Sequence, residues 1–348
     1  MRLQTLDTSR RHVAVTRSIQ SALLDPQTFH KTAIGRVLAL FCFFYVRLIR
    51  YQADLFRHLR NQIWGIGEAE YEACFRSGSK KAHPLQSMGD LGFSGSTFFS
   101  TTDTKFLIKS LPRHFEHSFF RKDLLGPYYH HMSLHPDSLL VWITDYIYAP
   151  YLTLGRLCKV TPAHHIIMAN TFSGRGGDGD GARQEWEKYD LKPVQYFYPE
   201  RDLFPDPLVS NETVNKLVDT LEDKVRISAG DYELLRGVLE SDTEFLRSNN
   251  AVDYSLFLVR FPASSQPGVI GRENRWRVGV PSTDGKWKYR AVVLDFFWAK
   301  HTLHAQALTG VVQMFNVVGH KGPMTITTTA AEYREKFLAM VDALVEVH

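Results

Sequence analysis

The stretch Gly92 to Ser110, GFSGSTFFSTTDTKFLIKS, places a lysine inside an apolar run shortly after a glycine- and serine-rich turn. Backbone N–H groups beside glycine can approach a phosphate because no Cβ stands in the way. Lys109 follows Gly95 by fourteen residues, about one hairpin later, whereas the lysine of a Walker loop directly follows glycine. The spacing predicts a hairpin that covers the phosphates of a nucleotide, with Lys109 neutralising their charge. An ordinary turn followed by a strand lysine that extends to solvent is the alternative.

Phosphoryl transfer also needs a carboxylate that holds Mg²⁺ and a carboxylate near the acceptor hydroxyl. Asp253 precedes the apolar run YSLFLV, and Asp295 interrupts AVVLDFF. A carboxylate in a buried strand carries a desolvation cost unless a cation compensates it. The short motif YDLK adds Asp190 and Lys192. For Asp253 or Asp295 taken singly, an aspartate that caps the turn at a strand end is the alternative.

Regular elements must bring these residues together. Apolar residues at helical spacing predict a helix in YQADLFRHLRNQI, residues 51–63. The segment 93–111 predicts a hairpin with the turn TTDT. Further strands are predicted in SLLVWITDYIYAPY (138–151), HHIIMANTF (164–172), DYSLFLVRFP (253–262) and YRAVVLDFF (289–297). Helices are predicted in NETVNKLVDTLEDKVR (211–226), GDYELLRGVLESDTEFLRS (230–248) and TAAEYREKFLAMVDALVEV (329–347), the last with Thr329 and Glu332 in capping-box spacing.

Composition limits the classes of protein that the chain can be. With 348 residues, 44% of them hydrophobic and 22% charged, it can bury a large core. Its net charge of +4 fits an anionic substrate, a nucleotide or a membrane surface, and no nucleic-acid motif is present. Three cysteines without motif spacing favour a reducing compartment over a disulfide framework.

The longest apolar run, VLALFCFFYV (37–46), is too short to cross a bilayer, which needs about 20 residues. We expect it to be a packed helix or strand, with a homodimer contact as one use and a membrane-surface element as an alternative because arginines flank it. The glycine-rich segment SGRGGDGDGARQE (173–185) lacks an apolar anchor and predicts a mobile linker rather than a nucleotide loop.

Eight segments in order resemble the phosphatidylinositol phosphate kinase family over roughly residues 50–346. They are LFRHLRNQIWGIGEAEYEACF, GFSGSTFFSTTDTKFLIKSL, LLGPYYHHMSLHPDSLL, HHIIMAN, YDLK, VDYSLFL, AVVLDFF and AAEYREKFLAMVDAL. The resemblance implies an α+β, bilobal kinase-like fold, similar to SAICAR synthase, with an antiparallel sheet and flanking helices in each lobe. It implies an N-terminal extension over 1–32, an N-terminal lobe over 33–170, a hinge insertion over 171–188 and a C-terminal lobe over 189–348.

The resemblance also implies roles for residues of this sequence. ATP phosphates would be covered by Gly92, Ser94, Gly95 and Ser96 and contacted by Lys109. Adenine would lie beside Met168, Ala169 and Asn170. Asp190 and Lys192 would face the phosphates, Asp253 would be the catalytic-loop aspartate, and Asp295 would bind Mg²⁺.

Two departures from the family pattern affect the predicted activity. Pro193 stands where the family's DLKG motif has glycine, and proline fixes φ and removes an N–H donor. In the activation segment WAKHTLHAQALTG, Lys300 is kept, but His301 and His304 stand where lysine and glutamate are expected. That segment selects the lipid headgroup in the family, so its change puts the lipid specificity in doubt.

The resemblance therefore predicts a magnesium- and ATP-dependent kinase that phosphorylates an inositol-ring hydroxyl of a phosphatidylinositol phosphate. The expected partners are a phosphoinositide lipid or an inositol phosphate and an anionic membrane surface, and the expected location is cytoplasmic and peripheral to membranes. The alternative is a weakly active or inactive homologue that binds lipid, nucleotide or a partner as a scaffold. A kinase acting on another small acceptor is a third hypothesis.

Overall fold

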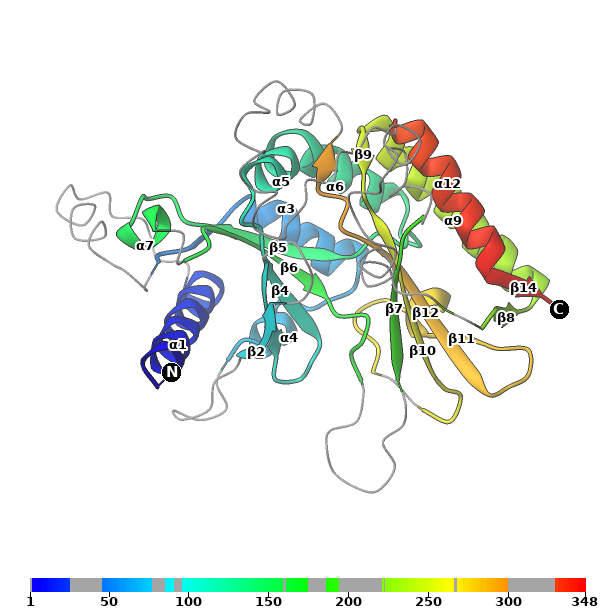
Figure 1. The fold of residues 1–348 in the computed structure, drawn as a ribbon, viewed down its shortest axis with the longest axis horizontal. Helices are drawn as coiled ribbons and strands as arrows, with labels where there is room; N and C mark the ends of the chain where they lie inside the picture. Colours follow the sequence, from blue (N-terminus) through cyan, green and yellow to red (C-terminus); the bar gives the residue numbers. More distant parts are fainter. Residues whose placement is uncertain are drawn as a thin grey trace, which may run out of the picture. The chain divides into compact units, whose positions relative to one another are not determined.

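The computed structural model describes residues 2–25, 46–76, 85–90, 96–158, 161–174, 186–193, 221, 223–265, 268–299 and 329–348 (Figure 1). The chain divides into two compact units. The first unit comprises Met1–His117, Trp142–Gly174 and Gly268–Arg272, and the second comprises Ser118–Val141, Arg175–Pro267 and Glu273–His348. Each unit combines helices with an antiparallel sheet, so the expected α+β class is confirmed.

A six-stranded antiparallel sheet forms the centre of the first unit. Its spatial order is β1 (Ile49–Arg50), β5 (Ile143–Tyr148), β6 (His164–Ala169), β4 (Phe106–Ser110), β3 (Thr97–Thr101) and β2 (Leu85–Asp90). The strands are rich in β-branched and aromatic residues, which pack well on a pleated surface. β3 and β4 form the predicted hairpin, with Phe99 opposite Ile108. β6 is buried along its whole length, as a central strand should be.

The first unit also contains several helices. They are α1 (Arg2–Leu24), α3 (Ala53–His58) with a π-helical turn over Leu59–Ile63, α4 (Glu68–Ala73) and α7 (Leu154–Leu157); α5 (His114–Phe119) begins in this unit. The predicted helix over 51–63 is thus confirmed. In α1, Val15, Ile19, Ala22 and Leu23 are buried at helical spacing, so part of the N-terminal extension is an ordered helix.

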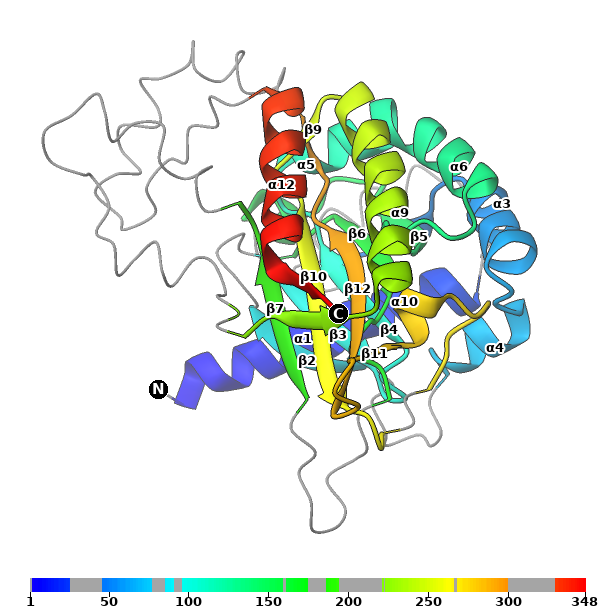
Figure 2. The same cartoon turned by 90° about the vertical axis from the view of Figure 1, so that its right-hand side faces the viewer.

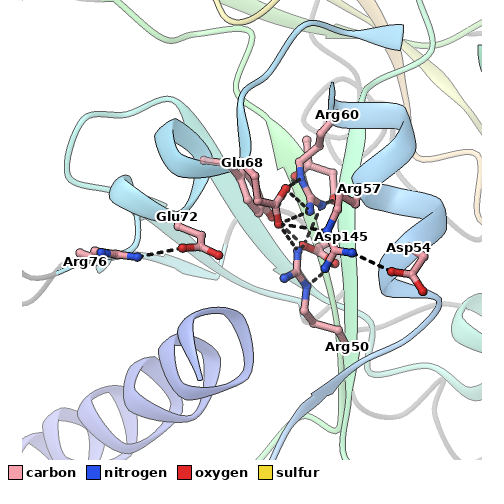
Figure 3. Close-up of polar contacts among 10 residues, drawn as sticks. Arg50, Asp54, Arg57, Arg60, Glu68, Glu72, Arg76 and Asp145 are labelled. Atoms are coloured by element: carbon pink, nitrogen blue, oxygen red, sulfur yellow. Dashed lines mark hydrogen bonds and ion pairs between the residues drawn. The ribbon is translucent and has the colours of Figure 1, made fainter. Parts of the chain in front are cut away.

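Buried ion pairs join the helices of the first unit to its sheet (Figure 3). The Arg60 guanidinium is fully buried and donates to both carboxylate oxygens of Glu68 in α4, at 2.8 and 2.7 Å, and to Asp145 in β5 at 3.0 Å. Arg50 reaches the same Asp145 carboxylate at 2.6 Å. The Tyr71 hydroxyl donates a further hydrogen bond to the Asp145 carboxylate, at 3.1 Å. These contacts compensate a carboxylate that lies inside the buried strand β5.

The second unit contains a four-stranded antiparallel sheet and two shorter strand pairs. The larger sheet has the order β11 (Val280–Pro281), β12 (Trp287–Leu294), β10 (Ser255–Pro262) and β7 (Glu187–Leu191). The short pairs are antiparallel β9 (Ala251–Val252) with β13 (Trp298–Ala299), and parallel β8 (Val225–Ile227) with β14 (Val345–Val347). The predicted strands in 253–262 and 289–297 are confirmed as β10 and β12.

Two long helices, α9 (Ala229–Ser248) and α12 (Ala330–Leu344), run side by side in the second unit (Figures 1 and 2). The predicted capping box of α12 is present: the Thr329 hydroxyl accepts from the Glu332 amide, and the Glu332 carboxylate accepts from the Thr329 amide. Two further helices are α6 (Leu125–Leu134), preceded by a π-helical turn over Phe120–Leu124, and α10 (Arg275–Val278).

Two predicted helices are wrong in part. The helix expected over 329–347 ends at Leu344, because Val345–Val347 form strand β14. The helix expected over 211–226 lies largely outside the described residues, but Val225 and Arg226 belong to strand β8. Val225 and Ile227 are buried there and pair with β14, a contact between distant parts of the chain that helical spacing does not reveal. The linker over 173–185 and the apolar run 37–46 lie almost entirely outside the described residues. Within the described ranges, no helix combines the length and the apolar character needed to cross a bilayer.

Candidate functional site

In the first unit, Lys109 lies in β4 and is nearly buried, with 5% of its surface exposed. Antiparallel pairing places Phe98 and Ile166 directly beside it. The face that carries Lys109 is therefore the opposite of the face on which Phe99 and Ile108 are buried. The Lys109 ammonium lies 5.6 Å from the centroid of the Phe98 ring, within cation–π distance. The lysine thus lies on the less buried face of the hairpin.

The three residues expected beside adenine lie at the end of β6. Met168 and Ala169 pair with Leu107 and Phe106 of β4. Asn170 follows the strand, and its side-chain amide donates to the Thr104 carbonyl at 2.7 Å while its backbone N–H donates to the Lys105 carbonyl at 2.9 Å. The Asn170 side chain therefore fixes the turn of the predicted hairpin.

Gly92, Ser94 and Gly95 lie outside the described residues. Ser96 is described and is fully buried just before β3. Ser110 in β4 accepts a hydrogen bond of 2.7 Å from the Thr97 amide, which ties the beginning of β3 to the end of the lysine strand.

In the second unit, four charged residues of the prediction come together. We call Asp190, Lys192, Asp253 and Asp295 the carboxylate–lysine cluster. The Lys192 ammonium donates to a carboxylate oxygen of Asp253 at 2.8 Å, and about 15% of each side chain is exposed. The strands explain this proximity, because β7 ends at Leu191 opposite Leu256, while Ser255 at the start of β10 pairs with Leu294 at the end of β12. Lys192, Asp253 and Asp295 therefore follow or precede neighbouring strand ends.

The charge of Lys192 depends on the whole carboxylate–lysine cluster. Burial of the ammonium lowers the pKa of Lys192, but the negative charges of Asp253, Asp190 and Asp295 outweigh this effect and raise that pKa above its ordinary value. Lys192 consequently stays protonated at neutral pH. The cluster thus brings three carboxylates close to one ammonium.

Both aspartates that were predicted to do chemistry have strained backbones. Asp253 has φ of 65° and Asp295 has φ of 62°, the left-handed region that residues other than glycine rarely occupy. Each lies in a short break between strands: Asp253 between β9 and β10, and Asp295 between β12 and β13. Strain of this kind costs about 1–3 kcal/mol and persists where the surrounding structure enforces it, often at functional sites.

Sequence reasoning missed the chain segment that supports Asp295. Leu139 and Val141 exchange backbone hydrogen bonds with Val293 of β12, at 2.7 and 3.0 Å. The Asp242 carboxylate of α9 holds the segment by accepting from the Leu139 amide and the Ser138 hydroxyl, each at 2.7 Å. The family-like sequence HPDSLL contains Ser138 and Leu139, but their contacts with the distant strand β12 and helix α9 are invisible in a local pattern.

A search of the described residues finds no group of three or more His, Cys, Asp or Glu side chains arranged to hold a metal ion. Mg²⁺ is commonly bound by one or two carboxylates together with substrate phosphates, and it keeps several waters. Asp295, a carboxylate close to the Lys192–Asp253 pair, fits that kind of site. The activation segment with Lys300, His301 and His304 lies outside the described residues.

Comparisons with known proteins agree on one family. The family model described as phosphatidylinositol-4-phosphate 5-kinase matches residues 79–280, a range that includes Lys109, Lys192 and Asp253. A phosphatidylinositol 4-phosphate 5-kinase of Plasmodium falciparum is 30% identical over 218 residues, which are 59% of this chain and 12% of that protein.

Two other relatives extend the comparison. A 1-phosphatidylinositol 3-phosphate 5-kinase of Mus musculus is 26% identical over 311 residues, 86% of this chain and 12% of the relative. The type-1 beta phosphatidylinositol 4-phosphate 5-kinase of Rattus norvegicus is 29% identical over 272 residues, 69% of this chain and 48% of the relative. The alignments thus span less than half of the length of each of these relatives.

Proposed function

Because the chain belongs to the phosphatidylinositol-4-phosphate 5-kinase family, we propose that it transfers the γ-phosphoryl group of ATP to an inositol-ring hydroxyl of a phosphatidylinositol phosphate at a membrane surface. The proposed architecture is the bilobal kinase-like fold, similar to SAICAR synthase. The observation that carries the proposal is the Lys192–Asp253 ion pair, together with the influence of Asp190 and Asp295 on Lys192.

The carboxylate–lysine cluster suits the demands of phosphoryl transfer. Positioning and charge neutralisation supply most of the rate in this reaction, because the protein forms no covalent bond to the phosphoryl group. Asp253 is the candidate that orients the acceptor hydroxyl and accepts its proton. Lys192, held protonated beside Asp253, restrains this carboxylate and offers positive charge to a phosphate.

In the first unit, Lys109 is the candidate for the phosphate-binding ammonium. Its nearly complete burial and its place on the less buried face of the hairpin support this role. Gly92, Ser94, Gly95 and Ser96 remain the proposed covering turn, and Met168, Ala169 and Asn170 remain the proposed border of the adenine site. We assign Asp295 as the protein ligand of Mg²⁺, which supplies charge neutralisation at the phosphates when it is bound.

A second function is favoured by Pro193. This residue is buried directly after Lys192, and a proline there provides no N–H group for a phosphate. A homologue that binds nucleotide or lipid without efficient transfer would tolerate such a change. We retain this scaffold as the alternative, and we treat a kinase of soluble inositol phosphates as a further outcome of the test.

The test is an assay with Mg-ATP and vesicles that contain each monophosphorylated phosphatidylinositol in turn, alongside soluble inositol phosphates. Wild type is compared with Lys109→Ala and Asp295→Ala, and with Lys188→Ala as a matched surface-lysine control in β7. We expect transfer to at least one lipid, a fall of at least about 100-fold in Lys109→Ala and Asp295→Ala, and no change in Lys188→Ala.

Each result separates the hypotheses. ATP binding by calorimetry without transfer to any acceptor would favour the scaffold. Transfer to soluble inositol phosphates alone would move the substrate class away from membranes. Equal turnover in wild type and both site variants would refute the assignment of Lys109 and Asp295.

A further inference from the structure

Asp253 lies between strands β9 and β10, and the pairing of these strands does not fix its position. β9 ends at Val252, which pairs with Trp298, and β10 begins at Ser255, which pairs with Leu294. Asp253 and Tyr254 therefore form a link between two different sheets. The positive φ of Asp253 adds strain to this link. A strained two-residue link needs an external support to keep the carboxylate in one position.

Helix α12 provides a contact to this link. The hydroxyl of Tyr333 donates a short hydrogen bond to the backbone carbonyl of Tyr254. The two rings meet edge to face with centroids 4.6 Å apart, and the Tyr254 ring also meets Phe337 at 4.9 Å. Tyr333 and Tyr254 are both fully buried, so the hydrogen bond is shielded from water.

The position of Tyr333 is itself well determined. It lies in the first turns of α12, immediately after Glu332 of the capping box. The neighbouring Arg334 guanidinium donates to the Glu240 carbonyl of α9 at 3.3 Å and lies 3.6 Å from the Glu244 carboxylate. A capped helix start and contacts with a second long helix hold the Tyr333 hydroxyl in place.

We propose that Tyr333 is a positioning residue for the reaction: through the Tyr254 carbonyl it holds Asp253 in the strained conformation in which this carboxylate meets Lys192. The proposal rests on the proposed kinase function, but the Tyr333–Tyr254 contact can be tested without an assay of activity. Tyr333 touches neither substrate nor cofactor in this account. Its effect reaches the reaction through one carbonyl and one backbone residue.

The first measurement is hydrogen exchange followed by mass spectrometry in wild type and Tyr333→Phe. Phenylalanine keeps the ring contacts and removes only the hydroxyl. We expect exchange of the amides in 250–256 to become about tenfold faster, as expected when a local opening is favoured. A peptide covering Ile143–Tyr148 of β5 should not change. Tyr232→Phe is the matched control, because it removes another hydroxyl that bonds to α12, at Asp342, away from Asp253.

The second measurement is steady-state kinetics on the best lipid vesicle. For Tyr333→Phe we expect kcat to fall by tenfold to about 100-fold while KM for ATP stays within about twofold, because a misplaced reactive group affects the transition state more than ground-state binding. Val341→Ala removes buried volume from the same helix and should lower the melting temperature at least as much as Tyr333→Phe. Its kcat should remain that of wild type.

These results distinguish failure of this inference from failure of the proposed function. Unchanged exchange in 250–256, or faster exchange with unchanged kcat, would overturn the role of Tyr333. A fall in kcat that Val341→Ala reproduces would also overturn it, since loss of stability would then explain the effect. Wild type that transfers phosphate to no acceptor would refute the kinase function, and the exchange data would then decide by themselves whether Tyr333 holds the link.

Discussion

Lys192 and Asp253 lie 61 positions apart in the sequence and meet with an N–O distance of 2.8 Å between the ammonium and the carboxylate. The pairing of β7 with β10 brings them together, since one residue follows the first strand and the other precedes the second. The contact joins the YDLK and VDYSLFL segments into one site. It is therefore the most direct target for mutation.

Replacement of Lys192 by methionine should abolish most activity while preserving the length of the side chain. Without the ammonium, Asp253 loses its ionic partner and the cluster keeps three carboxylates with no internal cation. We expect turnover to fall about 100- to 1000-fold, the range seen when one preorganised charge is removed. Lys188→Met, in strand β7 shortly before Lys192, is the control. Retention of more than half of the turnover would show that Lys192 does not serve the reaction.

The buried ion-pair network of the first unit should matter for stability. Asp145→Ala removes one of the two carboxylates that Arg50 and Arg60 share inside the protein (Figure 3). We expect a loss of about 3–5 kcal/mol in the free energy of unfolding, measured by urea denaturation, because buried charges that lose a partner are costly. Asp54→Ala breaks the exposed pair with Arg57, where the Asp54 side chain is 95% exposed, and should leave the urea midpoint unchanged. Equal midpoints for both variants would contradict this account.

Local patterns predicted much of the fold. The hairpin of β3 and β4, strands β10 and β12, and the capping box of α12 all depend on residues within a few positions of one another, and all are confirmed. The sequence of helix α1 contains a pattern that predicts it, namely the apolar residues Val15, Ile19, Ala22 and Leu23 at helical spacing. Strand β8 had no such signal, because its pairing partner is 120 positions away.

The candidate site was predictable as a set of residues and not as an arrangement. Resemblance selected Asp190, Lys192, Asp253 and Asp295, and the strand register then explains why they gather. The support of the site was not predictable. The hydrogen bond from Tyr333 to the Tyr254 carbonyl spans 79 positions, and the bond from Leu139 to Asp242 spans 103. Contacts of this range depend on the assembled fold.

His165 should make the protein sensitive to acid. Its imidazole is fully buried on β6, neither ring nitrogen has a hydrogen-bond partner among the described residues, and burial lowers its pKa to about 4. Between about pH 6.5 and pH 4, His165 binds a proton in the unfolded chain but not in the folded chain. The contribution of the neutral His165 to the free energy of unfolding is therefore complete above pH 6.5 and is lost as the pH falls toward 4. The loss should reach about 3 kcal/mol.

The measurement for His165 is urea unfolding at pH 7 and pH 4.5. In His165→Leu the difference in unfolding free energy between the two pH values should shrink by most of the expected loss of about 3 kcal/mol. His130→Gln, which changes an exposed histidine of α6, should behave as wild type. The same acid sensitivity in wild type and His165→Leu would assign the effect to other groups.

Gly271 should be intolerant of any side chain. It has φ of 65°, and a Cβ on it would lie 2.2 Å from the Trp64 carbonyl oxygen and 3.2 Å from the Trp142 ring. The next residue, Arg272, donates its amide to that carbonyl at 2.5 Å, so the backbone cannot shift without losing the bond. Gly271→Ala should lower the free energy of unfolding by at least about 2 kcal/mol, from backbone strain and the clash together.

Gly237→Ala is the opposite case, because this glycine lies inside α9 with open space around it, and alanine there should stabilise the protein by about 0.5–1 kcal/mol. If the urea midpoints of the two variants move in the same direction, the close approach of Gly271 to Trp64 does not determine the stability of the first unit.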